Sequence, residues 1–286
     1  MNLLTIRLDS AGDVLMCSPA LRALHEQGHR LTLLTSEAGA LAGTRIDAVS
    51  EVIRWGAPWM KASQTAGADS VAVMADALRE RQFDGAVIFT SYSQSPLPAA
   101  LLCQMADIPL RLAHCRENPY QLLTHWVRES EPLERLRHEV ERQTDLVAEL
   151  GCRPSSMRLG LRIDEQDRTV ARAALRDVGI DPDGDWLLLH PGASAPSRRY
   201  PSAGWRNAAL LLSSHLRVPL VFAGGPDDVE RVNEIINDDA GHGTTRWPSL
   251  AGRLDFGALA AAVSMARVLV ACNSAPAHLA AATRTP

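Results

Sequence analysis

The sequence contains almost no lysine. Lys61 is its single lysine, so nearly all of the 29 basic side chains are arginines, and 33 acidic residues outnumber them for a formal net charge of -4. A chain with this balance lacks the basic surface that nucleic-acid binding requires. We therefore expect no nucleic-acid partner, and the net charge indicates no other partner either.

Long apolar runs and paired cysteines are also absent. No apolar run approaches the roughly 18 residues of a membrane span, and the few apolar residues before Arg7 and Asp9 are too few for a signal-peptide core. The cysteines are odd in number, widely spaced and without a C-x-x-C zinc pattern. We expect buried, reduced thiols in a cytoplasmic protein, and peripheral contact with the inner face of a membrane stays open. The five cysteines are Cys17, Cys103, Cys115, Cys152 and Cys272.

The 286 residues, of which 46% are hydrophobic, suffice for two domains. Short apolar runs alternate with longer helical patterns, which is typical of parallel sheets with crossover helices. A helical pattern over 132–150 ends at Gly151, so we place the boundary within 152–167 and expect domains over 1–155 and 165–286. The runs that we expect to be strands are 3–8, 31–34, 52–55, 85–89, 186–190, 218–223 and 268–272.

Doubly wound domains bind ligands in the loops after their strands. In the first such loop, D-S-A-G-D, Asp13 falls in the first turn of a helix, where a helix-capping carboxylate is favoured. The alternative is a general base, either Asp13 or Asp9. Because Gly12 is the only glycine here, the loop lacks the G-x-G-x-x-G pattern of a dinucleotide-binding oxidoreductase.

Three later loops have residues suited to a phosphate group or a ribose. Arg198 and Arg199 end the loop H-P-G-A-S-A-P-S-R-R, although a solvated loop would look the same. The stretch N-S-A-P-A-H begins a helix whose backbone N–H groups favour an anion, with His278 either at the ligand or buried in the fold. The segment A-G-G-P-D-D-V-E offers carboxylates for ribose hydroxyls, or ordinary turn chemistry.

Taken together, four ordered motifs resemble glycosyltransferase family 9, the ADP-heptose:lipopolysaccharide heptosyltransferases. They are R-L-x-S-x-G-D-V-L-M-x-x-P-A-L from Arg7, H-P-G-A-S followed by R-R-Y-P, A-G-G-P-D-D, and N-S-A-P-A-H-L-A-A-A. The resemblance implies a GT-B fold of two Rossmann-like α/β domains facing across a cleft. It also implies an inverting, metal-independent sugar transfer with no cofactor besides the nucleotide-sugar co-substrate, and it leaves the oligomeric state undetermined.

The resemblance gives the loop residues roles. Asp13 matches the family's catalytic aspartate, which removes the acceptor proton, and Asp9 occupies a variable position and is the less favoured base. Negative charge on the leaving diphosphate would be stabilised by fixed donors. The expected donor-binding residues are Ser194, Arg198, Arg199, Gly224, Gly225, Asp227, Glu230, Asn273, Ser274, Ala275 and His278. The expected acceptor-binding residues are Gly12, Ser93, Gln94, Arg111 and Arg116, the two arginines for acidic sugar or lipid phosphate groups.

The sequence also departs from the family pattern. Arg198 stands where the family often has lysine, Asn273 where it often has an aspartate of the donor site, and Ala275 where it has glycine. The chain also stops at Pro286, where the family continues. We therefore expect an incomplete C-terminal domain. The main hypothesis is heptosyl transfer from ADP-heptose to a lipopolysaccharide core sugar; transfer of another nucleotide-activated sugar and non-catalytic nucleotide-sugar binding are the alternatives.

Overall fold

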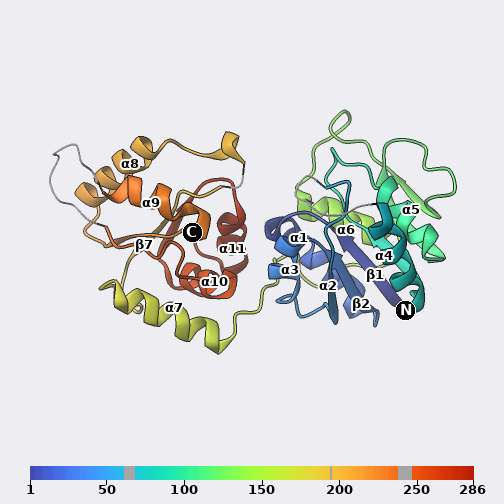
Figure 1. The fold of residues 1–286 in the computed structure, drawn as a ribbon, viewed down its shortest axis with the longest axis horizontal. Helices are drawn as coiled ribbons and strands as arrows, with labels where there is room; N and C mark the ends of the chain where they lie inside the picture. Colours follow the sequence, from blue (N-terminus) through green and yellow to red (C-terminus); the bar gives the residue numbers. More distant parts are fainter. Residues whose placement is uncertain (61–67, 194, 238–246) are drawn as a thin grey trace. The chain divides into compact units, whose positions relative to one another are not determined.

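The computed structural model describes residues 1–60, 68–193, 195–237 and 247–286. The chain divides into two compact units, Met1–Arg162 and Ile163–Pro286. Each unit has its own parallel sheet, drawn in Figure 1, and each is described by itself.

The first unit has a six-stranded parallel sheet of order β3-β2-β1-β4-β5-β6. The chain first moves outward from β1 to β3 and then returns to β4 on the other side of β1. This reversal creates a crevice at the carboxyl ends of β1 and β4, where ligands of such sheets bind. The strands are β1 (Asn2–Arg7), β2 (Arg30–Thr35), β3 (Glu51–Arg54), β4 (Gly85–Ile88), β5 (Leu110–Cys115) and β6 (His125–Arg128).

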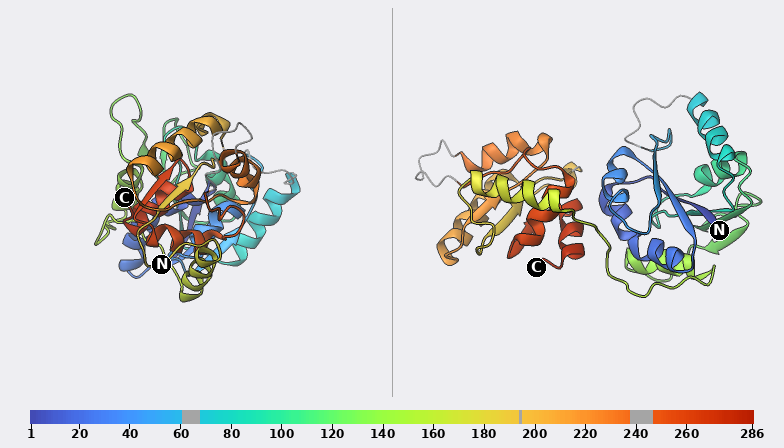
Figure 2. Two further views of the ribbon diagram at one scale, coloured as in Figure 1. Left: turned by 90° about the vertical axis from the view of Figure 1, so that its left-hand side faces the viewer. Right: turned by 90° about the horizontal axis from the view of Figure 1, so that it is seen from below.

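Helices cover both faces of this sheet (Figure 2). The helices α4 (Ala68–Glu80) and α5 (Leu97–Met105) pack together over one face, where a buried cluster includes Ile6, Leu78 and Leu102. The helices α2 (Ser18–Glu26) and α6 (Glu139–Ala148) pack together on the other face. Two short helices, α1 (Ala11–Met16) and α3 (Glu37–Gly43), follow β1 and β2 and contact each other.

The second unit has a three-stranded parallel sheet of order β8-β7-β9. Its strands are β7 (Leu187–His190), β8 (Leu220–Phe222) and β9 (Val268–Ala271). Figure 1 shows α8 (Ser202–His215) and α9 (Val229–Ile236) on one side of this sheet and α7 (Glu165–Asp177) and α10 (Phe256–Met265) on the other. The helix α11 (Ala275–Thr283) packs against α10, and two single 3-10 turns, η1 (Pro196–Arg198) and η2 (Pro226–Asp228), follow β7 and β8.

The seven apolar runs all form strands, as predicted, but β5 and β6 were missed. The expected helix over 132–150 was wrong at its beginning. The α6 helix starts at Glu139 with His138 as its N-cap, and Leu133 and Leu136, which supplied the helical pattern, are exposed. Gly151 takes the left-handed conformation at φ 75°, as a residue closing a helix should.

All five cysteines are free and buried. Among the helices in the described ranges, none combines the length and apolarity needed to cross a membrane.

Candidate active site

The junction between β1 and α1 fixes Asp13. The helix begins at Ala11 after the N-cap Ser10, so Asp13 lies in the first turn. One oxygen of its carboxylate, Oδ2, accepts hydrogen bonds from the backbone N–H of Ser10 at 3.1 Å and from the Ser10 hydroxyl at 2.6 Å. The helix-capping role expected from the sequence is therefore confirmed, and the side chain is still 41% exposed and accessible to a ligand.

Arg7, the last residue of β1, connects three carboxylates. Its guanidinium is 1% exposed, with Nε at 2.8 Å from Asp9 Oδ2, Nη2 at 3.3 Å from Asp13 Oδ1 and Nη1 at 3.0 Å from Glu139 Oε1. Burial alone would lower the pKa of Arg7, but the nearby acidic groups outweigh burial and raise it. The guanidinium is thus a permanent cation that holds Asp13 in place from below the surface.

Asp9 is the more enclosed of the two loop carboxylates. Burial raises its pKa, while the Arg7 charge and a hydrogen bond from Gln94 oppose that shift. Gln94 Nε2 donates to Asp9 Oδ1 at 2.6 Å. Because Gln94 Oε1 accepts the backbone N–H of Ser91 at 2.9 Å, the amide can only present its NH₂ group to Asp9.

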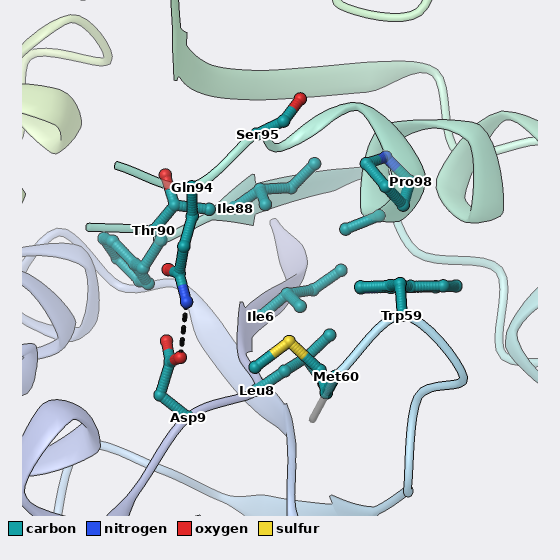
Figure 3. A pocket seen from close by; sticks show the side chains of 12 residues that line it. Ile6, Leu8, Asp9, Trp59, Met60, Ile88, Thr90, Gln94, Ser95 and Pro98 are labelled. Atoms are coloured by element: carbon teal, nitrogen blue, oxygen red, sulfur yellow. Dashed lines mark hydrogen bonds between the residues drawn. The ribbon is translucent and has the colours of Figure 1, made fainter. Parts of the chain in front are cut away.

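A cavity of about 490 Å³ opens beside Asp9 at the carboxyl ends of β1 and β4 (Figure 3). Ile6 and Ile88 come from these strands, and Trp59 comes from the segment that follows β3. The volume falls within the range of about 300–1,000 Å³ that small-molecule pockets occupy. The crevice expected from the strand order therefore contains a pocket of ligand size.

The predicted acceptor residues are only partly brought together. Gln94 lines the cavity, and the Ser93 hydroxyl lies 3.1 Å from that of Ser91 in the same loop. Arg111 donates to the carbonyl groups of Leu122, Ile108 and Gln121, and Arg116 donates to those of Tyr92 and Glu131. Gly12 is buried inside α1. The two arginines thus bind the protein's own backbone.

In the second unit the loops after all three strands converge. Ser274 Oγ, after β9, donates to Gly192 O, after β7, at 3.1 Å. Asp228 Oδ2 accepts the backbone N–H of Gly225, after β8, at 3.0 Å, and a Cβ atom placed on Gly192 would lie only 2.1 Å from the same oxygen. Gly192 therefore permits a close approach that no larger residue would allow.

A second pocket, of about 410 Å³, lies beside η2 and α9. It brings together Arg199, Asp227 and Glu230, three of the predicted donor residues, with Asp228, Arg231 and Glu234. The Arg199 side chain also donates to Ala193 O at 2.8 Å. Of the other predicted donor residues, Arg198 is exposed in η1, Asn273 is exposed, Gly224 is buried, and Gly225, Ala275 and His278 are half-buried. Ser194 lies outside the described residues.

The start of α11 suits an anion. Its N-cap Ser274 makes no side-chain cap hydrogen bond and donates instead to the loop after β7, and Pro276 lies in the first turn. The backbone N–H groups of this turn are therefore not capped by the N-cap side chain, and the helix dipole adds partial positive charge there.

Several residues at these sites were not found from the sequence. Arg7 was read only as the start of the first motif, and Glu139 only as part of the helical pattern over 132–150. Trp59 and Gly192 were not singled out for a role. A usable signal existed for Trp59, since G-A-P-W directly follows the predicted strand over 52–55. For Glu139 there was none, because it reaches Arg7 across 132 positions of sequence.

The sequence profile of glycosyltransferase family 9 (heptosyltransferase) matches residues 71–286. The chain belongs to glycosyltransferase family 9. The resemblance found in its motifs is thereby confirmed, as is the class of enzyme. Residues 1–70, which include Asp13, lie outside the match.

Individual relatives agree with the family assignment. The Escherichia coli protein lipopolysaccharide heptosyltransferase 3 is 37% identical over 97 residues, a match that spans 32% of this chain and 28% of that protein. The family 9 glycosyl transferase of Veillonella parvula superposes with a TM-score of 0.80 at 19% identity, covering 99% of this chain and 78% of the other. Escherichia coli ADP-heptose lps heptosyltransferase II superposes with a TM-score of 0.75 at 22% identity, covering 100% of this chain and 83% of the other. The two structures confirm the expected α/β GT-B fold.

Proposed function

We propose that this family 9 member transfers a heptosyl group from ADP-heptose to a hydroxyl group of a lipopolysaccharide core sugar. The observation that carries the proposal is Asp13, an accessible carboxylate fixed by Arg7 and Ser10 at the end of β1. The names of two relatives, a lipopolysaccharide heptosyltransferase and an ADP-heptose heptosyltransferase, support the choice of donor and acceptor. A lipid-linked acceptor implies peripheral contact with the inner face of the cytoplasmic membrane.

In the proposed reaction Asp13 acts as general base. It takes the proton of the acceptor hydroxyl while that oxygen attacks the anomeric carbon of the donor. The new glycosidic bond forms as the bond between that carbon and the diphosphate oxygen breaks, so ADP leaves with the electron pair and the anomeric configuration inverts. Arg7 and Ser10 keep the carboxylate in one orientation throughout, which lowers the cost of reaching the reactive geometry.

The second unit would stabilise the leaving diphosphate. Fixed donors act best where charge develops, and the first turn of α11 with Arg198 and Arg199 supplies them without a metal ion. Asp227 and Glu230 border the pocket of about 410 Å³ and would accept hydrogen bonds from the ribose hydroxyls. Asn273, Ser274 and His278 complete the proposed phosphate side of the donor site.

The donor can be identified by comparing nucleotide sugars one at a time. The purified chain is incubated with a lipopolysaccharide core acceptor and one nucleotide sugar per reaction. The four nucleotide sugars are ADP-heptose, ADP-glucose, UDP-glucose and GDP-mannose, and mass spectrometry measures the mass of the acceptor after each reaction. We expect a heptose-sized mass increase from ADP-heptose alone. A mass increase from another donor would move the assignment to that sugar. Saturable ADP-heptose binding without any product would identify a non-catalytic binding protein.

A further inference from the structure

The cavity beside Asp9 has two kinds of wall. Trp59, Met60 and Leu8 form an apolar wall, and Asp9 and Gln94 form a polar end (Figure 3). The Trp59 ring is held by an edge-on contact with the ring of Trp55, with centroids 5.2 Å apart and planes at 78°. A flat ring fixed opposite a carboxylate suits a ligand that is apolar on one side and carries donors on its edge.

The polar end has unused hydrogen-bonding capacity. Asp9 Oδ1 accepts one bond from Gln94 and Oδ2 faces Arg7 Nε, whereas a carboxylate can accept about four bonds. Hydroxyl groups of a bound ligand would use this remaining acceptor capacity of Asp9.

The charge of the cavity restricts the ligand further. Asp9 is the one charged side chain among the described residues that line it. The Arg7 guanidinium behind it already pairs with Asp9, Asp13 and Glu139. A ligand carboxylate or phosphate would therefore meet like charge, and no described residue that lines the cavity carries an offsetting positive charge. A ligand ammonium would find Asp9 already paired with Arg7 at 2.8 Å. An uncharged ligand avoids both penalties.

We propose that this cavity binds an uncharged sugar ring of the acceptor, with the apolar face of the ring on Trp59 and its hydroxyl groups donating to Asp9, and that it rejects acidic sugars. The assignment rests on the proposed function, because it names the class of sugar that the transferase accepts. It gives Asp9 a role in acceptor specificity, distinct from the base Asp13. Both carboxylates contact the same guanidinium, so a sugar bound at Asp9 lies in the neighbourhood of the base.

Binding can be measured without any nucleotide sugar. The full chain is titrated with methyl α-mannoside, methyl glucuronide and protonated glucosamine, and saturation-transfer NMR reports each affinity. We expect methyl α-mannoside to bind at least about tenfold more tightly than the other two probes. Equal or tighter binding of the glucuronide or the amino sugar would overturn the proposal.

Two variants place the binding in the cavity. Trp59→Leu removes the stacking surface and Asp9→Asn removes the charged acceptor, and each should weaken mannoside binding about tenfold. Asp9→Asn should also admit methyl glucuronide. The matched controls Trp126→Leu and Asp185→Asn change a half-exposed tryptophan and an exposed carboxylate elsewhere, and should leave the affinity unchanged.

Unchanged mannoside binding in Trp59→Leu would overturn the proposal even if Asp9→Asn fails to fold, because Trp59 is only partly buried. Failure of the proposed function looks different. Mannoside binding with this dependence on Trp59, together with no product from ADP-heptose, would support the cavity assignment and contradict heptosyl transfer.

Discussion

Arg7 Nη2 lies 3.3 Å from Asp13 Oδ1, and the guanidinium that makes this contact is 1% exposed. A buried cation therefore supports an accessible carboxylate at the end of the first strand. The same guanidinium reaches Glu139 on α6, so the position of the proposed base depends on a helix more than a hundred residues away in sequence.

Arg7→Met should destabilise the protein strongly. The substitution leaves the partly buried carboxylates of Asp9 and Glu139 without their cation, and breaking a buried ion pair in this way costs about 3–5 kcal/mol. Urea unfolding followed by fluorescence measures the loss. Arg267→Met, which removes an exposed ion pair with Asp185, should cost less than about 1 kcal/mol.

The cause of that loss can be separated from simple loss of packing. The triple variant Arg7→Met/Asp9→Asn/Glu139→Gln removes the negative charges of Asp9 and Glu139 together with the Arg7 cation. It should be more stable than Arg7→Met alone, and a triple variant as unstable as the single one would contradict the electrostatic explanation.

His114, in β5, should make stability depend on pH. Its Nε2 lies 3.1 Å from the carbonyl oxygen of Arg142, so Nε2 carries the proton of the neutral ring. Burial first, and then the charge of Arg142, lower its pKa to about 4. Since the unfolded chain protonates near 6.5 and the folded chain only near 4, the unfolded state binds more protons between these values.

Stability should therefore fall as the pH is lowered from about 6.5 to about 4, with a slope approaching 1.4 kcal/mol per pH unit from this residue. Urea unfolding at several pH values measures the slope. His114→Gln should reduce it, whereas His215→Gln, an exposed histidine, should not. A slope that His114→Gln leaves intact would assign the effect to other groups.

Gly192→Ala should weaken ADP binding by about tenfold or more. The new Cβ would lie 2.1 Å from Asp228 Oδ2, which has to move and thereby lose its hydrogen bond with Gly225. Calorimetric titration with ADP measures the effect. Gly184→Ala, where the added Cβ meets its nearest atom at 3.5 Å, is the matched control and should bind ADP normally.

A double variant identifies the clash as the cause. With Asp228→Ala present, Gly192→Ala should add little further loss, because the two residues act through one contact. Fully additive losses would contradict the proposed contact between the two loops.

The central strands of both sheets could be predicted from the sequence because parallel strands buried on both faces are continuous apolar runs. The positions of Asp13 and of the three donor loops followed from those runs, since ligand loops follow the carboxyl ends of strands. The family motifs then gave Asp13 a chemical role that capping alone does not give.

The strands β5 and β6 were hidden by their polar residues. Arg111 and His114 interrupt the apolar pattern of β5, and both are accommodated only because backbone carbonyl groups elsewhere in the fold accept their hydrogen bonds. The start of α6 was misjudged for a related reason. Glu131 accepts the backbone N–H of Arg137 and pairs with its side chain, which stabilises a non-helical path before His138.

The cavity could not be predicted because its walls come from distant segments. Trp59 follows β3, Gln94 follows β4, and only the strand order of the folded sheet brings them to Asp9. From its place in the motif Asp9 was interpreted as a bystander. The structure places Asp9 in the cavity wall, where its carboxylate is largely buried and accepts a hydrogen bond from Gln94.

The single-turnover rate of Asp13→Asn tests the central claim most directly. Purified protein in excess over ADP-heptose is mixed with acceptor, and the rate of product formation is measured. ADP affinity is measured separately, and Asp185→Asn is the control for both. The account predicts a rate lower by about 10²–10⁴-fold, the range of a general base, with ADP affinity unchanged. A rate equal to that of the unsubstituted protein would contradict the assignment of Asp13 as the base.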